Sequence, residues 1–386
     1  MLYMTHIDEN LSKGYTQCAL NYIKALQTQS VNFELFTLMN GVQWANAPWW
    51  IQDSADYFAK TQSDRKCILV HLMPSDLCEA PLIALERKAD ECAIGLTTFE
   101  TTHLPAWIAE TLNSKLDGLI VPSEFNKTAL LNSGVTIPIH VVYHALGDWW
   151  WKDKPFSEDK DDDVFVYGYV GAWNNRKNPE AVLRAYLQAF PESTGKHALL
   201  IKTHGPNAID SLVKHTIKSL VGEESREDIW FYNADWDEDQ MLWLFKYIDC
   251  YVSAHKGEGF GLGLAQSAVV GKPVIYTGFS APTEWLGKER GHYPLKFKPK
   301  AVDGVDASVN LHFSDSMNKN TLFWAEPDFE DLAHTMLDVF NNKGDISVDT
   351  AHIRKALSWD SVGQSLVSAI ESVSGRKLQK VTEKVT

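Results

Sequence analysis

A single carboxylate lies inside a glycine-rich stretch in the second half of the chain. The stretch reads Gly257-Glu258-Gly259-Phe260-Gly261 and follows an apolar run, residues 247–252. A helix-like run over 262–270 comes next and ends at Gly271-Lys272-Pro273. Glycines let a backbone approach a ligand closely, and a helix N-terminus attracts anions. The order strand, loop, helix therefore indicates a site for a sugar that bears a phosphate.

The elements that must position this loop are apolar strands alternating with helices. In the first half we predict strands at 1–5, 33–39, 67–72, 92–97, 118–121 and 139–143, with a polar loop over 9–16, a helix over 17–27, and a second helix capped by Ser123. Polar turns follow several strands, including residues 74–76. Continuous apolar strands of this kind are typical of a parallel sheet covered on both faces, whose ligands bind at the carboxyl ends.

A second alternation fills the rest of the chain. We predict strands at 164–170, 198–203, 228–232 and 274–277, helices at 180–190, 209–220 and 237–248, and one or two helices in the tail, 348–386. The charged segment 151–163 between the two alternations is predicted to be a linker or a solvated loop. The pattern favours an α/β fold with two similar lobes and a cleft.

Composition narrows the class of protein. The chain has 386 residues, 45% hydrophobic and 22% charged, which suits a soluble protein of two domains. No apolar run is long enough to span a membrane, and the first ten residues do not resemble a signal peptide. Five scattered cysteines suggest reduced thiols in the cytoplasm. The net charge of −14 opposes non-specific binding to nucleic acid or anionic membrane.

Tryptophan is abundant, with 14 residues, and two clusters stand out at 44–50 and 149–151. Packing in a core or between domains is one interpretation of these clusters. A platform for a sugar ring or a nucleic-acid base is the other.

The loop residues also carry a family resemblance. Glu258-Gly259-Phe260-Gly261-Leu262, followed by 271–275, resembles the donor-binding signature of the retaining glycosyltransferases of family four. Stretches 121–125, 141–144, 171–179 and 324–328 agree with it, so that the resemblance covers roughly residues 95–365. It implies a GT-B fold of two Rossmann-like lobes, namely an acceptor-side lobe (1–155), a donor nucleotide-sugar lobe (156–345) and C-terminal helices that cross back to the first lobe (346–386).

The resemblance implies an enzyme that moves a sugar from a UDP- or GDP-linked donor with retention of configuration, without a metal or another cofactor. Glu258 would face the donor sugar, and Arg176, Lys177 and Lys202 would stabilise the departing diphosphate. The donor site would also include Gly14, Gly257, Gly259, Phe260, Gly261, Leu262, Gln266, Thr283 and Glu284. At the acceptor, His71 and Glu100 are the candidates, with His103 and His144 as competing histidines.

Two positions depart from the family pattern. Gln266 stands where the family usually has a second glutamate that holds the ribose, and an amide forms only neutral hydrogen bonds there. Ala172 stands where many members have an arginine, which Arg176 could replace.

These departures leave three hypotheses open. The favoured one is transfer to a saccharide or a lipid-linked glycan. A phage-type enzyme that glycosylates a hydroxymethylated pyrimidine in DNA is the second, and an inactive protein that binds sugar nucleotides is the third. The sequence indicates neither the donor base nor an oligomeric state.

Overall fold

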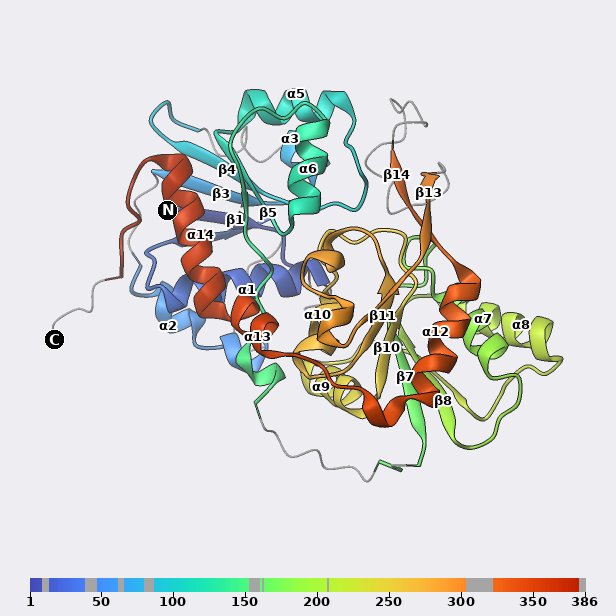
Figure 1. The fold of residues 1–386 in the computed structure, drawn as a ribbon. Helices are drawn as coiled ribbons and strands as arrows, with labels where there is room; N and C mark the ends of the chain where they lie inside the picture. Colours follow the sequence, from blue (N-terminus) through green and yellow to red (C-terminus); the bar gives the residue numbers. More distant parts are fainter. Residues whose placement is uncertain are drawn as a thin grey trace. The chain divides into compact units, whose positions relative to one another are not determined.

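The structure is a computed structural model that describes residues 1–8, 14–38, 47–61, 66–79, 87–152, 160–161, 163–206, 208–302 and 322–381. The chain divides into two compact units. Unit 1 contains Met1–Asp148 and Lys355–Thr386, and unit 2 contains Trp149–Arg354. Each unit is built on a six-stranded sheet flanked by helices (Figure 1).

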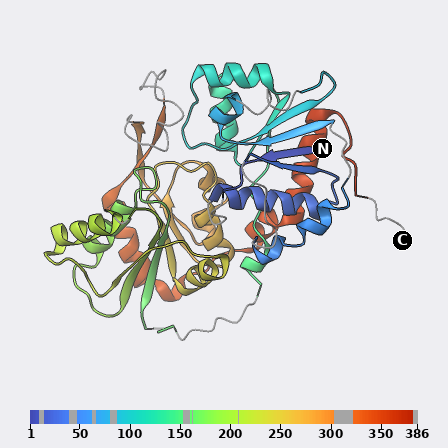
Figure 2. The ribbon, with the colours of Figure 1, turned by 180° about the vertical axis from the view of Figure 1, so that it is seen from behind.

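All neighbouring strands of the unit 1 sheet run parallel, in the order β2-β1-β3-β4-β5-β6. The strands are β1 (Leu2–Thr5), β2 (Glu34–Thr37), β3 (Cys67–His71), β4 (Cys92–Leu96), β5 (Gly118–Val121) and β6 (Ile139–Val141). The α-helices are α1 (Gly14–Thr28), α2 (Ser54–Phe58), α3 (Pro74–Glu79), α5 (Ala106–Lys115), α6 (Glu124–Asn132) and α14 (Trp359–Ser374), with a 3-10 turn η2 at Trp49–Ile51. Helices α1 and α14 cover one face of the sheet, and α3, α5 and α6 cover the other (Figures 1 and 2).

The C-terminal helix α14 belongs to unit 1 because it packs along α1. A Cβ atom on Gly363 would lie 2.3 Å from the carbonyl oxygen of Ala25, so only glycine permits this close approach of the two helices. The indole Nε1 of Trp359 donates a hydrogen bond to Oδ1 of Asn21 over 2.7 Å. Unit 1 is therefore formed by both ends of the chain.

The unit 2 sheet is also parallel, in the order β12-β11-β10-β7-β8-β9. Its strands are β7 (Phe165–Val170), β8 (His197–Thr203), β9 (Ile229–Asn233), β10 (Cys250–Ser253), β11 (Val274–Thr277) and β12 (Tyr293–Leu295), and an antiparallel pair, β13 (Phe297–Ala301) and β14 (Phe323–Pro327), adds a second sheet. The α-helices are α7 (Pro179–Ala189), α8 (Ala208–Val221), α9 (Glu238–Tyr247), α10 (Leu262–Val269) and α12 (Phe329–Asn341). The 3-10 turns are η4 (Ala281–Glu284), η5 (Lys288–Arg290) and η6 (Lys343–Asp345), while η3 (Asp148–Trp150) and helix α13 (Ala351–Leu357) span the unit boundaries.

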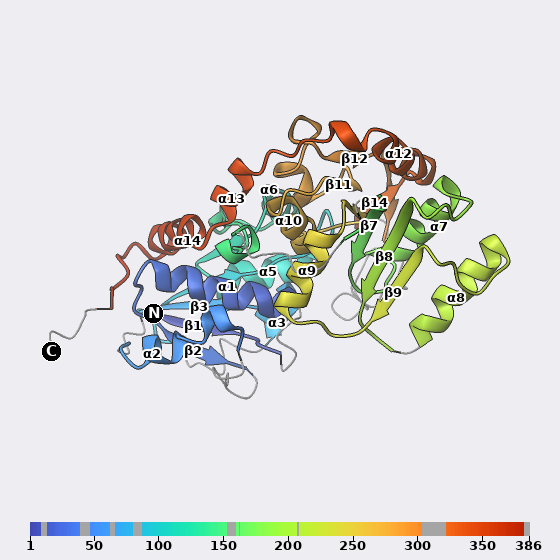
Figure 3. The ribbon, with the colours of Figure 1, turned by 90° about the horizontal axis from the view of Figure 1, so that it is seen from below.

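The core of unit 2 lies between its sheet and helices α7 and α12. Tyr167, Tyr186 and Met336 are fully buried there, and the Tyr167 hydroxyl donates to the carbonyl oxygen of Met336. Helices α9 and α10 lie on the opposite face (Figure 3). A sheet buried on both faces explains why its strands are continuous apolar runs rather than alternating ones.

The two parallel sheets confirm the predicted α/β class. Ser123 caps α6 as predicted, and Asp237 caps α9 in a capping box with Gln240. Two local predictions are wrong. Residues 74–76 begin helix α3 rather than forming a turn, because Pro74 suits the first position of a helix. Helix α1 begins at Gly14, so the predicted polar loop does not extend to residue 16.

The tryptophans at the start of unit 2 are buried. Trp149 and Trp150 are 4% and 3% exposed, their rings stack at 4.5 Å, and Trp150 also contacts Phe245. In unit 1, Trp50 is buried against Trp359, whereas Trp49 is half exposed. Residues 44–46 and most of the predicted linker lie outside the described residues. In the part of the chain that the structure describes, no helix combines the length and apolar character needed to cross a membrane.

Candidate functional site

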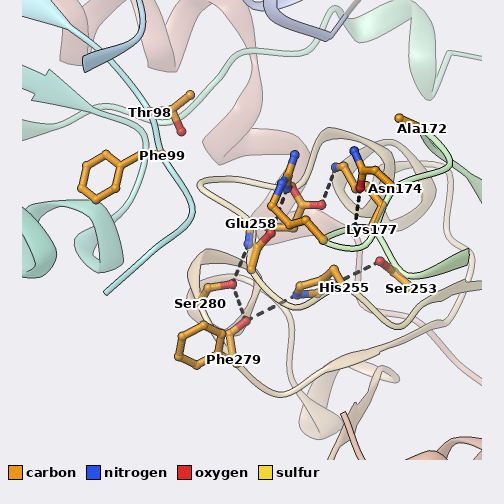
Figure 4. Close-up of polar contacts among 12 residues, drawn as sticks. Thr98, Phe99, Ala172, Asn174, Lys177, Ser253, His255, Glu258, Phe279 and Ser280 are labelled. Atoms are coloured by element: carbon orange, nitrogen blue, oxygen red, sulfur yellow. Dashed lines mark hydrogen bonds and ion pairs between the residues drawn. The ribbon is translucent and has the colours of Figure 1, made fainter. Parts of the chain in front are cut away.

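The Glu258 carboxylate lies between two cations at the carboxyl ends of strands β7 and β10. Lys177 Nζ donates to Oε1 of Glu258, and Arg176 Nη1 lies 3.4 Å from Oε2. Figure 4 shows Glu258 and Lys177 pointing toward one another. The Glu258 side chain is 6% exposed, and those of Arg176 and Lys177 are 11% and 26% exposed. The carboxylate that the sequence singled out thus lies in contact with the basic pair 81 residues before it.

The charge of Glu258 depends on these partners. Burial alone would raise the pKa of the carboxyl, but attraction to Lys177 and Arg176 outweighs burial and lowers the pKa to about 2. Glu258 is therefore ionised at neutral pH, and its carboxylate can accept hydrogen bonds but cannot donate one.

The loop after β7 holds the basic pair in place through its own backbone. Asn174 Oδ1 accepts a hydrogen bond from the Lys177 N–H at 2.8 Å, and Asn178 adopts a left-handed conformation (φ 53°) before α7 starts at Pro179. Asparagine tolerates this conformation better than most residues, which explains its place at the turn. From this loop, the side chains of Arg176 and Lys177 both reach the Glu258 carboxylate.

Direct contacts join this loop to the glycine-rich loop. Arg176 Nη1 donates to the Gly257 carbonyl oxygen at 2.9 Å, and the Lys256 N–H donates to the Arg176 carbonyl oxygen at 2.8 Å. Arg176 therefore fixes the backbone on which Glu258 is mounted as well as contacting its carboxylate.

The glycine-rich loop leads into α10 through Gly261. Gly261 has a φ of 93°, in the left-handed region that favours glycine, and its carbonyl oxygen accepts the Ala265 N–H. Phe260 is buried against Trp285, and the Glu258 N–H donates to Ser280 Oγ at 3.0 Å. The loop is thereby anchored to the segment after β11, and the N-terminus of α10, which favours anions, follows directly.

Several residues of the site were not predicted. Lys256 Nζ donates to Asn175 Oδ1 at 2.7 Å and pairs with Glu326 Oε2 at 3.1 Å. Glu326 lies on β14, within the 324–328 motif, and also pairs with Lys300 on β13. Asn175 lies 81 residues before Lys256 and Glu326 lies 70 residues after it, so spacing along the chain did not predict these contacts. The 324–328 motif was the one sequence signal for Glu326.

His255 was likewise missed, although it stands in the stretch before the loop. Its Nδ1 lies 3.1 Å from Ser253 Oγ and its Nε2 lies 3.5 Å from the Phe279 carbonyl oxygen. Burial lowers the pKa of His255 to about 4 despite the nearby Glu258 carboxylate. His255 is therefore neutral at physiological pH, and its ring lies between Ser253 and Phe279 (Figure 4).

In the described ion pairs of Glu258 and Glu326, cations outnumber carboxylates. Arg176 and Lys177 share Glu258, and Lys256 and Lys300 share Glu326, so that each carboxylate faces two cations. In a chain with a net charge of −14, this local excess is a physical reason for an anion to bind here.

The other predicted donor residues take different places in unit 2. Lys202 is the last residue but one of β8 and lies beside Val170; it is buried, and its pKa is lowered by burial and partly restored by Asp235. Leu262 and Gln266 are half-buried on α10, and Gly257 and Gly259 are buried in the loop. Thr283 and Glu284 lie within the 3-10 turn η4, where Thr283 Oγ1 donates to the Ser280 carbonyl oxygen.

The predicted acceptor residues and Gly14 belong to unit 1. His71 ends β3, is fully buried, and is surrounded by Tyr3, Tyr15 and Tyr22. Its Nδ1 lies 3.0 Å from the Tyr3 hydroxyl, and among the described residues its Nε2 has no hydrogen-bond partner. Glu100 is half-buried after β4, and Gly14 is exposed at the first position of α1. The roles assigned to His71, Glu100 and Gly14 stay predictions.

Over the described ranges, no group of three or more His, Cys, Asp or Glu side chains is placed to hold a metal ion.

No protein-family model matches the chain, and no curated protein matches its sequence. Solved structures do match. Anabaena HepE in complex with UDP and glucose aligns with a TM-score of 0.65 at 13% identity, over 96% of this chain and 100% of that chain. Sucrose-phosphate synthase from Thermosynechococcus elongatus aligns with a TM-score of 0.65 at 12% identity, over 97% and 99%.

A third match is the lipopolysaccharide outer core galactosyltransferase WaaB, with a TM-score of 0.60 at 14% identity over 96% of this chain and 99% of that chain. These likenesses span whole chains, and at such identities they establish the fold. The protein therefore has the GT-B fold of two Rossmann-like lobes, as the sequence resemblance implied.

Proposed function

We propose that the protein is a glycosyltransferase that uses a nucleotide-diphosphate sugar. The observation that carries the proposal is the buried Glu258 carboxylate, held between Arg176 and Lys177 beside a glycine-rich helix start. The GT-B fold and the likeness to HepE, whose solved structures contain UDP or UDP-glucose, support it.

The residues divide the chemistry between charge and hydrogen bonding. When the bond from the sugar to the diphosphate breaks, the leaving phosphate gains negative charge, which Arg176, Lys177 and the α10 N-terminus would stabilise. Glu258 would accept hydrogen bonds from sugar hydroxyls and favour the positive charge that develops on the ring. We infer that the diphosphate takes over part of the pairing that Arg176 and Lys177 now give to Glu258, since both cations are already in place.

The finer assignment follows the resemblance to family four. We propose transfer with retention of configuration from a UDP- or GDP-linked donor, with cations of the chain rather than a metal compensating the diphosphate. A saccharide or a lipid-linked glycan is the favoured acceptor, because the acidic chain opposes a nucleic acid. The boundaries 1–155, 156–345 and 346–386 for the functional lobes and the cytoplasmic location also stay predictions.

An inactive sugar-nucleotide-binding protein is the second candidate. Gln266 in place of a second glutamate and Ala172 in place of an arginine favour it, because both changes remove charge from the donor site. Such a protein would bind the donor without breaking it.

One experiment separates the two candidates. The purified chain is titrated with UDP, GDP and ADP by calorimetry and then incubated with the corresponding glucose donors, and release of nucleoside diphosphate is measured with and without an acceptor glycan mixture. Binding together with release supports the enzyme. Binding without release from any donor supports the inactive protein, and absence of binding would contradict both.

A further inference from the structure

Two cysteines of unit 1 face each other across neighbouring strands. Cys67 begins β3 and Cys92 begins β4, and the two residues are paired in register in this parallel ladder. Neighbouring strands lie about 4.8 Å apart, and in-register side chains point to the same face of the sheet. Disulfides form when the Cα atoms are roughly 4.4–6.8 Å apart. The ladder thus holds the two thiols at a separation at which they can be joined.

The surroundings of the two thiols differ. Cys67 is 4% exposed, whereas Cys92 is partly exposed at the start of its strand. The Asp117 carboxylate lies beside them, because its Oδ2 accepts the N–H of Ala93 at 2.8 Å. Arg87 pairs with the same carboxylate. Of the two residues, Cys92 is thus the more accessible to an oxidant from solution.

Hydrogen bonding between the thiols adds to this asymmetry. The hydrogen bond with Cys67 lowers the pKa of Cys92, and the same bond and burial raise the pKa of Cys67. A thiolate is the nucleophile in reactions with peroxide, and a protonated neighbour can then react with the oxidised sulfur.

The other cysteines lack this arrangement. Cys18, Cys78 and Cys250 are buried, and burial raises the pKa of Cys18 and of Cys250. Within the described strands, only the Cys67–Cys92 pair brings two cysteines into register.

We propose that Cys67 and Cys92 form a peroxide-sensitive dithiol that closes reversibly to a disulfide. The Cys92 thiolate attacks one oxygen of hydrogen peroxide, the O–O bond breaks, and hydroxide leaves and takes up a proton to form water. Cys92 becomes a sulfenic acid. The Cys67 sulfur then attacks the Cys92 sulfur, the S–O bond breaks, and the second oxygen leaves as water with the Cys67 proton. Both sulfurs are oxidised and the peroxide is reduced, and a thiol such as dithiothreitol reverses the closure.

The site lies at the amino ends of β3 and β4, on the face that α14 covers. Gly118 pairs with Ile94, which lies two residues after Cys92, and a Cβ atom on Gly118 would contact Val373 of α14. A Cys67–Cys92 disulfide would therefore link β3 to β4 beneath α14, at the amino ends of these strands, whereas His71 lies at the carboxyl end of β3.

The test uses the full chain and hydrogen peroxide. After oxidation and alkylation of the remaining thiols, a digest without reductant is analysed by mass spectrometry. We expect a peptide pair joined through Cys67 and Cys92 as the main disulfide, absent after dithiothreitol. Persistence of both residues as alkylated thiols, or conversion of Cys92 to sulfinic acid without the linked pair, would overturn the proposal.

Variants supply the second readout. In Cys67→Ser the sulfenic acid on Cys92 has no thiol to react with, so dimedone labelling of Cys92 should rise severalfold over the wild type. Cys250→Ser is the matched control and should retain the linked pair. Equal dimedone labelling in the wild type and in Cys67→Ser would exclude Cys67 as the resolving thiol. The wild-type digest tests the proposal even if a variant does not fold.

Discussion

The strand ends of the two units contain buried polar groups with opposite charge behaviour. In unit 1, His71 lies among tyrosines, and burial together with the neighbouring His144 lowers its pKa well below the ordinary value. In unit 2, Glu258 is also buried, yet its carboxyl is held ionised by Lys177 and Arg176. Burial alone favours the neutral form of a titratable side chain, and a nearby opposite charge is needed to keep a buried side chain ionised.

This difference places a buried, ionised carboxylate in unit 2 and a buried, neutral histidine in unit 1. A nucleoside diphosphate needs fixed cations, and the described contacts gather them around Glu258 and Glu326. His71, Tyr3 and Tyr22 are fully buried, and burial keeps this cluster neutral, since it lowers the pKa of the histidine and raises those of the tyrosines.

The largest effect is expected when the carboxylate of unit 2 is removed. Glu258→Gln should lower donor turnover by about 100- to 1,000-fold, the range for loss of one electrostatic group from a transition state. The amide cannot balance the charges of Arg176 and Lys177. Nucleoside diphosphate release under saturating donor measures the effect. The control is Glu180→Gln, because Glu180 is a half-buried residue of α7 that pairs with Arg184 rather than with the site. Turnover of Glu258→Gln close to the control would remove Glu258 from the site.

A smaller effect is expected from one of the cations. Lys177→Met should weaken UDP or GDP binding by roughly tenfold, equivalent to about 1.4 kcal/mol, because a partly buried cation would no longer face the diphosphate. Calorimetric titration measures the affinity.

The matched control for Lys177 is Lys218→Met. Lys218 also pairs with a glutamate, Glu224, but both side chains are more than half exposed. Exposed pairs contribute little, so the affinity should stay within about twofold of the wild type. If both variants weakened binding equally, the loss would reflect overall charge rather than the site.

Acid should destabilise the fold because buried histidines are neutral in both units. The folded pKa is lowered to about 3 for His144 in unit 1 and to about 4 for His255 and His292 in unit 2, from 6.5. Between these values the unfolded chain binds protons that the folded chain does not, so the free energy of unfolding falls as the pH drops from about 6.5 to about 4. For Glu258, stability present above pH 4.5 is lost as the pH falls toward about 2.

Thermal unfolding between pH 8 and pH 5 measures this loss as a falling Tm. His292→Leu removes one of the buried histidines and should flatten the slope, whereas His334→Leu changes an exposed residue and should not. A Tm that is constant over this range would show that the histidines are not neutral in the fold.

The smallest effect is expected at the second carboxylate. Glu326→Gln would leave Lys256 without its ionic partner and loosen its contact with Asn175. Because Glu326 is 39% exposed, we expect an increase in donor KM of only about fivefold, near 1 kcal/mol, with kcat little changed. Glu330→Gln on α12, which bonds Gln188 at the surface, is the control. A large loss of kcat instead would mean that Glu326 acts directly on the donor.

Most strands of the fold could be predicted from the sequence, because parallel strands that are buried on both faces are continuous apolar runs. The helix cap at Ser123 was also predictable, since a side-chain cap depends only on residues close in the sequence. The β13–β14 pair was not predicted, because its pairing joins distant segments and Phe297 and Lys298 are exposed. Helix α3 was missed because Pro-Ser-Asp is typical both of turns and of helix starts.

The sequence alone determined that Glu258 stands in a glycine-rich loop between a strand and a helix, and that a basic pair follows an earlier strand. Tertiary structure decided that these groups meet, because parallel β7 and β10 are neighbours and bring their carboxyl ends together. It also decided that Glu326 reaches Lys256, that Trp149 stacks on Trp150, and that Cys67 faces Cys92. Local propensity fixes elements, whereas strand order and register fix which distant side chains touch.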